Sequence, residues 1–349
     1  MRIEARAPAK LVLMGEYAVL HGAPAIVAAV NRLVHVALVP GTDGRWTVHT
    51  DLGGGQDGEL TFDPASDAPA WTRPLETVIT RAAASVGKAP GELPGGDITI
   101  ESAALHVDAG ETKLGLGSSA AVVTALSAAL RAALAHWKLA GEAAPALADD
   151  LATHQAVQSG RGSGVDVAAS VEGGVLRYAV VDGAPRAAPL ALPEGVVFGV
   201  VWTGVPASTT AFVKGVADWA AADPAAHDQA IEDLAALAQQ AVAACETGDA
   251  PAFLATVRAY REAMDALGQG AGLPIVSDAH RAIADLAETE GVAYKPSGAG
   301  GGDVGLLFAP SRPALVQAGR LAERAGYRLL DLDVHPVGVR VTSDERTAP

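Results

Sequence analysis

A glycine-rich stretch stands directly before a run of helix-forming residues. It reads KLGLGSSAAVVTALSAALRAAL from Lys113. Residues 120–134 are mostly Ala, Leu and Val without Pro or Gly, which favours a helix with Ser118 as a suitable N-cap. Gly115 and Gly117 can adopt positive φ angles and expose their backbone N–H groups. The loop and the helix N-terminus together would then form a cradle for an anion such as a phosphate. The alternative is a tight strand-to-helix turn with an ordinary serine cap.

Two further segments are rich in glycine. One is APAKLVLMGEYAVLHGAPAIV from Ala7, in which Lys10 precedes a short strand. The other is KPSGAGGGDVGLLF from Lys295, whose glycine density is hard to explain by packing because each glycine costs backbone entropy. We expect Asp303 to fix this last loop through a local hydrogen bond. Three such segments in this order favour a ligand site over three unrelated turns.

The elements that must position these segments follow from the sequence pattern. Strands are predicted at residues 3–7, 11–14, within 25–39, 98–101, 174–181, 196–202, 304–308, 327–332 and 337–342. Helices are predicted at 71–86, from 118, at 145–158 and 313–325, and over most of 208–290, with breaks near 224, 248–251 and 268–274. Residues 41–58 are expected to form a hairpin or a surface loop. The irregular order predicts an α+β fold in two halves, residues 1–190 and 191–349.

The composition excludes several classes of protein. A chain of 349 residues suits one large or two medium domains. The net charge of −15 argues against nucleic acid or an anionic membrane as partner, and no apolar run is long enough to span a bilayer. A single cysteine, Cys245, excludes an intrachain disulfide framework, and the N-terminus resembles no export signal. We therefore expect a cytoplasmic protein; its oligomeric state is left open, a homodimer included.

The three motifs together resemble those of the GHMP kinases, with Ala9 where that superfamily usually has glycine. The resemblance implies an N-terminal domain like the second domain of ribosomal protein S5 and a ferredoxin-like C-terminal domain. It also implies ATP and Mg²⁺ as cofactors, with Ser119 as a metal ligand and Lys10 and Asp166 as catalytic residues. The residues that it assigns to ATP are Lys113, Gly115, Leu116, Gly117, Ser118, Ser119 and Ala120.

Within this superfamily the segments GRGSGVDVAAS and WTGVPASTTAFV resemble the phosphomevalonate kinase family, whereas His21 and Gly22 are more typical of mevalonate kinases. A phosphorylated small-molecule acceptor needs an extra cation, and Arg161 is suitably placed for it. The expected substrate-binding residues are Glu16, Tyr17, Arg161, Ser163, Gly164, Ser208, Thr209, Lys295, Ser297, Gly298, Ala299 and Gly300. The resemblance implies ATP-dependent phosphorylation of 5-phosphomevalonate to 5-diphosphomevalonate in the mevalonate route to isoprenoids. The alternatives are a mevalonate kinase and a metabolite sensor of the same fold that does not turn over.

Several of these residues also have an ordinary structural interpretation. Asp166 could cap the turn that follows it, and Ser208 could be a plain N-cap. Lys295 could be a structural lysine. The position where mevalonate kinases place a second magnesium ligand holds Gln155, and a neutral amide is a poor ligand for Mg²⁺.

Overall fold

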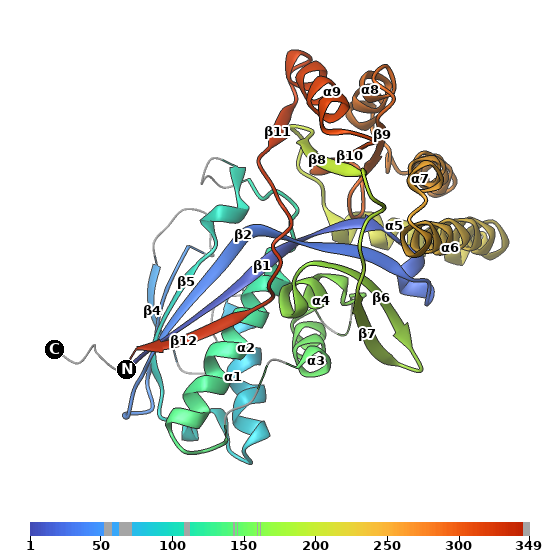
Figure 1. Cartoon of the computed structure of the whole chain (residues 1–349). Helices are drawn as coiled ribbons and strands as arrows, with labels where there is room; N and C mark the ends of the chain where they lie inside the picture. The colour runs from blue at the N-terminus through green and yellow to red at the C-terminus, as the bar shows by residue number, and fades with distance from the viewer. Residues whose placement is uncertain are drawn as a thin grey trace.

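The computed structural model describes residues 1–51, 58–62, 72–107, 112–141, 144, 146–158, 160 and 162–344, with residues 58–62 described as backbone only. Within these residues the larger sheet has eight strands and the order β12-β1-β2-β5-β3-β4, with β6 paired to β2 and β7 paired to β6. Figure 1 shows β12, β5 and β4 of this sheet on the left, β6 and β7 at the lower right, and the smaller sheet at the top. The strands of the larger sheet are β1 (Arg2–Met14), β2 (Ala25–Pro40), β3 (Trp46–Thr50), β4 (Gly58–Phe62), β5 (Gly96–Glu101), β6 (Val175–Val181), β7 (Ala184–Pro189) and β12 (Arg340–Asp344).

The two strands predicted at residues 3–7 and 11–14 are one strand, β1, which pairs along its length with β2. The register shifts between Pro8 and Ala9, where a bulge accommodates the proline, which has no N–H group to donate to the ladder. The prediction of two strands was wrong because a proline at a bulge does not end the pairing. Lys10 consequently lies on a continuous strand, opposite Ala29 of β2.

Residues 41–58, expected to form a loop or hairpin, contain β3, which pairs parallel to β5 and antiparallel to β4. Trp46 and Val48 on β3 are fully buried. β3 and β4 follow one another in the chain and pair antiparallel, which agrees with the hairpin alternative, and the surface-loop alternative was wrong for residues 46–50. Residues 52–57 of this prediction lie outside the described residues.

Four helices of the first half pack near this sheet, and short 3-10 segments connect other elements. The helices are α1 (Arg73–Ser85), α2 (Ser118–His136), α3 (Leu147–Val157) and α4 (Val165–Glu172). The 3-10 segments are η1 (Ala18–His21), η3 (Pro90–Glu92) and η4 (Ala103–Leu105). Among the described residues, α2 has the length and apolar composition of a membrane span, but 72% of that window is buried inside the protein. We therefore assign α2 to the core between the sheet and its neighbouring helices.

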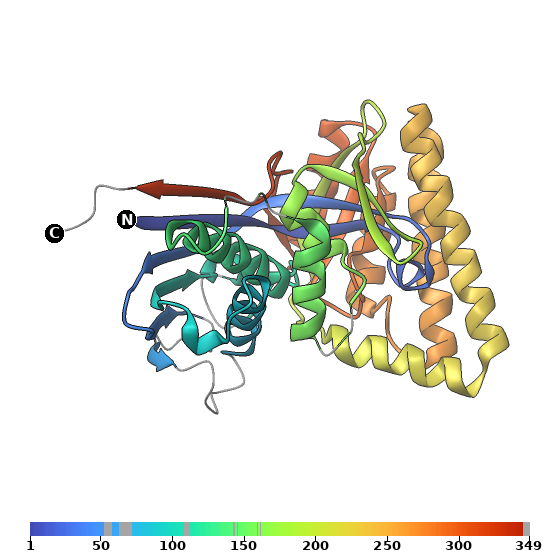
Figure 2. The ribbon, with the colours of Figure 1, turned by 90° about the horizontal axis from the view of Figure 1, so that it is seen from below.

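The smaller sheet belongs to the second half of the chain. Its order is β11 (Arg328–Leu330), β8 (Val197–Trp202), β10 (Val304–Ala309) and β9 (Ala293–Pro296), all antiparallel. Its helices are α5 (Thr209–Ala222), α6 (Pro224–Thr247), α7 (Ala250–Ala271), α8 (Asp278–Glu288) and α9 (Arg312–Arg324). Figure 2 shows α6 and α7 as long neighbouring helices at the far side of the molecule from the chain ends.

The predicted breaks within residues 208–290 correspond to helix boundaries. Ser208, Asp223 and Asp249 are the N-caps of α5, α6 and α7, and each side chain accepts a hydrogen bond from a backbone N–H of the first turn. The break predicted at 268–274 begins later, because α7 continues through Gly268 to Ala271 and the left-handed Gly272 follows as its C-cap.

The end of the chain returns to the first sheet. Strand β12 pairs antiparallel with β1, so that Ile3 lies opposite Ser343, and Figures 1 and 2 show the red β12 beside the blue β1. Just before it, Asn31 donates its backbone N–H to the carbonyl of Asp333. The two halves are thus joined by the last strand as well as by the chain near residue 190, and the boundary at 190 stays a prediction.

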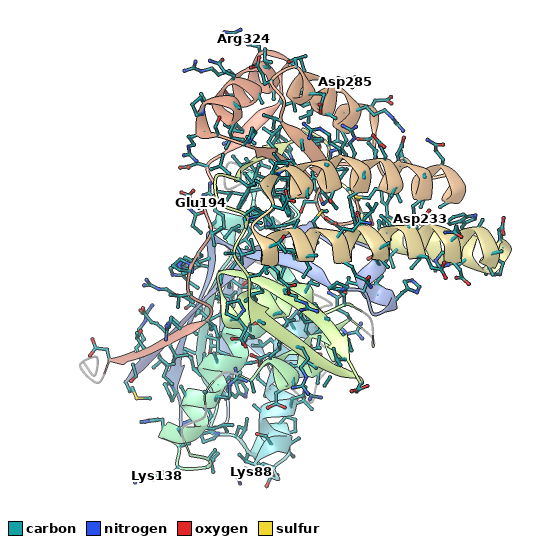
Figure 3. All side chains as sticks on the ribbon, turned by 45° about the vertical axis from the view of Figure 1, so that its right-hand side comes forward. Lys88, Lys138, Glu194, Asp233, Asp285 and Arg324 are labelled. Carbon is teal, nitrogen blue, oxygen red and sulfur yellow. The ribbon has the colours of Figure 1, made fainter. Side chains whose placement is uncertain are left out.

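The charged side chains labelled in Figure 3 project from the outside of both halves, with Lys138 beyond α2, Asp233 on α6 and Asp285 on α8. All three are exposed. The acidic residues that matter below differ from these because they lie between the two halves.

Candidate active site

The glycine-rich loop ends at the N-terminus of α2. The N-cap is Gly117, in a left-handed conformation with φ of 77°, and among the described residues no side chain accepts a hydrogen bond there. The expectation that Ser118 is the N-cap was wrong, since Ser118 is the first residue of the helix itself. The first backbone N–H groups of α2 therefore have no side-chain cap and can bind an anion, as the helix dipole favours.

The residues assigned to ATP differ in what they expose. Ser118 and Ser119 are partly exposed in the first turn of α2, and Lys113 is exposed on a β-bridge to His106. The side chains of Leu116 and Ala120 are buried in the core. These two residues can meet a ligand only through their backbone.

Lys10 contacts the glycine-rich loop that precedes α2. Its backbone N–H donates to the carbonyl of Leu116 over 2.9 Å, and its ammonium Nζ lies 3.4 Å from the carbonyl oxygen of Gly115. A Cβ atom on Gly117 would lie 3.0 Å from Cγ and Cε of Lys10 and 3.5 Å from Cβ of Asp166. Gly117 is therefore favoured by its positive φ and by the close approach of Lys10, whereas Asp166 lies at an ordinary van der Waals distance. The two residues predicted to be catalytic are neighbours at the helix N-terminus.

Three carboxylates surround the Lys10 ammonium. Burial lowers its pKa, and the charges of Asp166, Glu16 and Asp303 oppose that shift. These carboxylates come from three different segments of the chain. Together they favour the charged form of Lys10 beside the glycine-rich loop that precedes α2.

Asp166 lies in the first turn of α4, just after the left-handed Gly164. Its Oδ1 accepts a hydrogen bond from the N–H of the next residue, Val167, over 3.0 Å. This contact is not a helix cap, because the N-cap of α4 is Gly164. Tyr178 on β6 donates its hydroxyl to the carbonyl of Ser163 over 2.7 Å. A Cβ on Gly164 would lie 2.6 Å from that hydroxyl, so a side chain there would collide with Tyr178, which holds Ser163 and Gly164 in place. Arg161 lies outside the described residues.

The third motif is buried and braces the first. Lys295 Nζ lies 2.5 Å from Glu16 Oε1 and donates to the carbonyl of Pro296, while the Ser297 hydroxyl donates to the carbonyl of Val12 over 3.0 Å. Lys295 is fully buried and Glu16 is 4% exposed. The ammonium of Lys295 and the hydroxyl of Ser297 already donate to protein atoms, so we expect both residues to position the site. The structural interpretation of Lys295 accounts for these contacts.

Two tyrosines complete the contact between the motifs. Tyr17 has a positive φ of 61° and donates its hydroxyl to the carbonyl of Ala299 over 2.6 Å. Tyr260 on α7 donates to the backbone carbonyl of Glu16 over 2.8 Å. No local sequence pattern predicts these contacts, because more than 240 residues separate the partners. Gly298 and Gly300 both have positive φ angles, and their contact with substrate stays a prediction.

The side chain of Asp303 binds a segment far away in the chain, whereas the sequence predicted a local hydrogen bond. Its Oδ1 accepts from the N–H of Ala207, 96 residues earlier, over 3.0 Å. Ser208, next to Ala207, is an N-cap of α5 and accepts from the N–H of Ala211 over 3.3 Å. Ser208 and Thr209 are exposed, so the N-terminus of α5 is open to a ligand.

A magnesium ion would need oxygen ligands here. Over the described part of the chain, no three His, Cys, Asp or Glu side chains lie together as a ready metal site. The hydroxyl of Ser119 and the carboxylate of Asp166 are both hard donors beside residues 113–117, the glycine-rich segment called the phosphate loop below. They fit a cation held mainly by nucleotide phosphates. Gln155 instead donates its amide to the carbonyl of Gly162 over 3.4 Å, so it supports the loop before Asp166.

Comparison with known proteins agrees with this geometry. Residues 77–174 match the family model described as the GHMP kinases N terminal domain. A phosphomevalonate kinase from a Streptomyces species is 34% identical over 338 residues, covering 86% of this chain and 88% of the relative. A mevalonate kinase from Aeropyrum pernix is 30% identical over 269 residues, 76% of each chain.

A solved structure of Streptococcus pneumoniae phosphomevalonate kinase in complex with phosphomevalonate and AMPPNP has a TM-score of 0.75 and 18% identity. It covers 95% of this chain and 99% of that one. At this identity the likeness concerns the fold, which is the mixed α+β arrangement expected from the sequence. With a relative 34% identical over most of both sequences and the family's three motifs converging on one site, the chain belongs to the GHMP kinases.

Proposed function

We propose that this protein transfers the γ-phosphoryl group of ATP to the phosphate of 5-phosphomevalonate and releases ADP and 5-diphosphomevalonate. The observation that carries the proposal is the 34% identity to the Streptomyces phosphomevalonate kinase over 86% of this chain. The site supports it, because two uncapped helix N-termini and a lysine ammonium surround the region where two phosphates would meet.

The reaction needs little covalent chemistry from the protein. An oxygen of the acceptor phosphate attacks the γ-phosphorus of ATP, a new P–O bond forms, and the bond from the γ-phosphorus to the bridging oxygen breaks. ADP leaves with that electron pair. A phosphate monoester has its second pKa near ~6, so the attacking oxygen is already deprotonated at neutral pH. Asp166 then orients the acceptor and balances the charge of Lys10, and it is not an obligatory base.

Charge is the main problem of this reaction, since both substrates are anions. Lys10 holds a positive charge at the mouth of the phosphate loop, and the N–H groups of α2 carry the partial positive charge of the helix. Bound Mg²⁺ would offset further charge on the ATP phosphates. Ser119 and Asp166 are the residues of this chain that would hold it.

The test measures ADP release by the purified protein with Mg-ATP and, separately, 5-phosphomevalonate, mevalonate, homoserine and galactose, with product mass as confirmation. We expect turnover with 5-phosphomevalonate and a product heavier by one phosphate. Turnover with mevalonate alone would replace the proposal by a mevalonate kinase. ADP binding without turnover of any acceptor would instead support a metabolite sensor.

His21, which resembled mevalonate kinases, lies on η1 with its ring centroid 5.4 Å from that of His227 on α6. Its ring therefore contacts the helical layer, and it offers no support for a mevalonate acceptor. The expectations of a cytoplasmic location, of no nucleic-acid or membrane partner and of a homodimer stay predictions.

A further inference from the structure

Asp303 lies where three segments of the active site meet. It follows the third glycine motif, it contacts the segment that leads into α5, and its side chain faces the phosphate loop. None of these contacts is local in sequence. The residue therefore connects the nucleotide side of the site to the side where an acceptor would bind.

The backbone of Asp303 is held by the segment after β8. Its N–H donates to the carbonyl of Val205 over 2.7 Å, and its carbonyl accepts from the N–H and the hydroxyl of Thr203. These bonds hold Asp303 in a left-handed conformation with φ of 52°, which is costly for most residues but tolerated by Asp and Asn. The side chain is consequently fixed in direction.

The side chain turns its two oxygens toward different segments. Oδ1 accepts from the N–H of Ala207, the residue before the N-cap of α5. Oδ2 lies against Gly115, where an added Cβ would be 2.5 Å away. Gly115 has a φ of 73° and no side chain, so the carboxylate rests directly on the backbone of the phosphate loop. One carboxylate thus spaces the phosphate loop from the N-terminus of α5.

A negative charge between two anion-binding segments needs a nearby cation. Lys10 supplies it, since its charge stabilises the ionised form of Asp303. Burial raises the pKa of Asp303, while the Ala207 N–H and Lys10 oppose that rise. The charge of Lys10 therefore partly neutralises the carboxylate, which reduces its repulsion of the anionic substrates.

We propose that Asp303 is a positioning residue that sets the spacing between the phosphate loop and residues 205–210, and so aligns the acceptor with the γ-phosphate of ATP. This inference rests on the proposed function for the identity of the acceptor. In-line transfer depends strongly on the distance between the reacting atoms, so a small change in this spacing would weaken productive acceptor binding.

The test uses the full chain with four single substitutions. Asp303→Ala and Asp303→Gly remove the carboxylate, and glycine adopts the left-handed backbone without strain. Asp303→Asn keeps an oxygen that can accept from the Ala207 N–H. Thr203→Val is the matched control, because it removes hydroxyl bonds to the same loop and leaves the carboxylate intact.

Three readouts are compared: the KM for acceptor, the Kd for ADP by calorimetry, and the amide hydrogen exchange of residues 203–211. We expect Asp303→Ala and Asp303→Gly to raise the acceptor KM about tenfold or more, because a hydrogen bond to a charged group is lost. The Kd for ADP should change by less than about threefold, and exchange at Ala207 should accelerate. Asp303→Asn should stay near the wild type. Thr203→Val, which keeps the bond from the Thr203 N–H to the Asp303 carbonyl, should change each readout less than Asp303→Ala does.

Equal losses of ADP binding and acceptor binding would overturn the inference, as would unchanged acceptor KM and exchange in both deletion variants. An effect of Thr203→Val equal to that of Asp303→Ala would assign the role to loop rigidity in general. If the wild type phosphorylates a different acceptor, the proposed function fails, and the same comparison is made with that acceptor. If no acceptor is turned over, the exchange at Ala207 and the Kd for ADP decide.

Discussion

The ammonium of Lys295 lies 2.5 Å from the Oε1 atom of Glu16, although 279 residues separate them in the chain. Both side chains are buried, and Glu16 Oε1 also accepts from the N–H of Gly298 over 3.3 Å. The pair joins the strand that carries Lys10 to the third glycine motif. It therefore fixes the first and last motifs relative to each other from behind the site.

Breaking this pair should destabilise the protein strongly. Lys295→Met leaves the Glu16 carboxylate buried without its cation, and such a loss costs about 3–5 kcal/mol of unfolding free energy. Urea denaturation followed by circular dichroism measures it. The control is Lys214→Met, which breaks an exposed ion pair with Asp218 on α5 and should cost less than about 1 kcal/mol. Equal losses in the two variants would contradict the structural role of the buried pair.

Lys10→Met should reduce kcat more than it reduces nucleotide affinity. The ammonium lies at the phosphate loop, where charge develops during transfer, and the loss of one such preorganised group costs about 10²- to 10³-fold in kcat. Steady-state kinetics give kcat, and calorimetry with ADP gives the affinity. A kcat within about threefold of the wild type would exclude Lys10 from catalysis.

Asp166→Asn distinguishes a base from an orienting group. A general base contributes about 10²- to 10⁴-fold, whereas a deprotonated phosphate acceptor needs none. With 5-phosphomevalonate we expect a loss below about 10²-fold, and kcat/KM should fall below a pH of about 6 in both proteins as the acceptor phosphate gains a proton. Disappearance of that acidic limb in Asp166→Asn would show instead that Asp166 is the titrating base.

His280 should make the protein sensitive to mild acid. It is fully buried between the Tyr294 hydroxyl and the carbonyl of Gly302, and burial lowers its pKa to about 4. In the unfolded chain His280 is protonated below a pH of about 6.5, whereas in the folded protein it is protonated only below about 4. The contribution of His280 to the unfolding free energy is therefore fully present above pH 6.5. It falls as the pH drops toward 4, by about 3 kcal/mol in total.

The measurement is urea denaturation at pH 7.5, 6, 5 and 4.5. His280→Gln, which cannot take up a proton in this range, should lose this part of the pH dependence, even if it is less stable throughout. His136→Gln, at the exposed end of α2, should keep the wild-type slope. An unchanged slope in His280→Gln would assign the acid sensitivity to other groups.

Local signals predicted much of the fold. Gly115, Gly117 and the alanine-rich run predicted the start of α2 at residue 118, and the breaks predicted near 224 and 248–251 fall at the starts of α6 and α7. These signals work because caps and helix propensity act within a few residues. The same reasoning divided β1 in two, because a proline in a bulge looks like a strand end in sequence.

The sequence by itself determined the three glycine motifs, the lysine and aspartate beside them and, through the superfamily resemblance, the reaction class. Only the tertiary structure decided that Lys295 supports Glu16 and that Asp303 spaces the phosphate loop from α5. It also decided that β12 closes the first sheet. These contacts join residues far apart in the chain, and such contacts form only when packing brings distant segments together. No local pattern of residues records them, because their energy comes from burial and charge in the folded state.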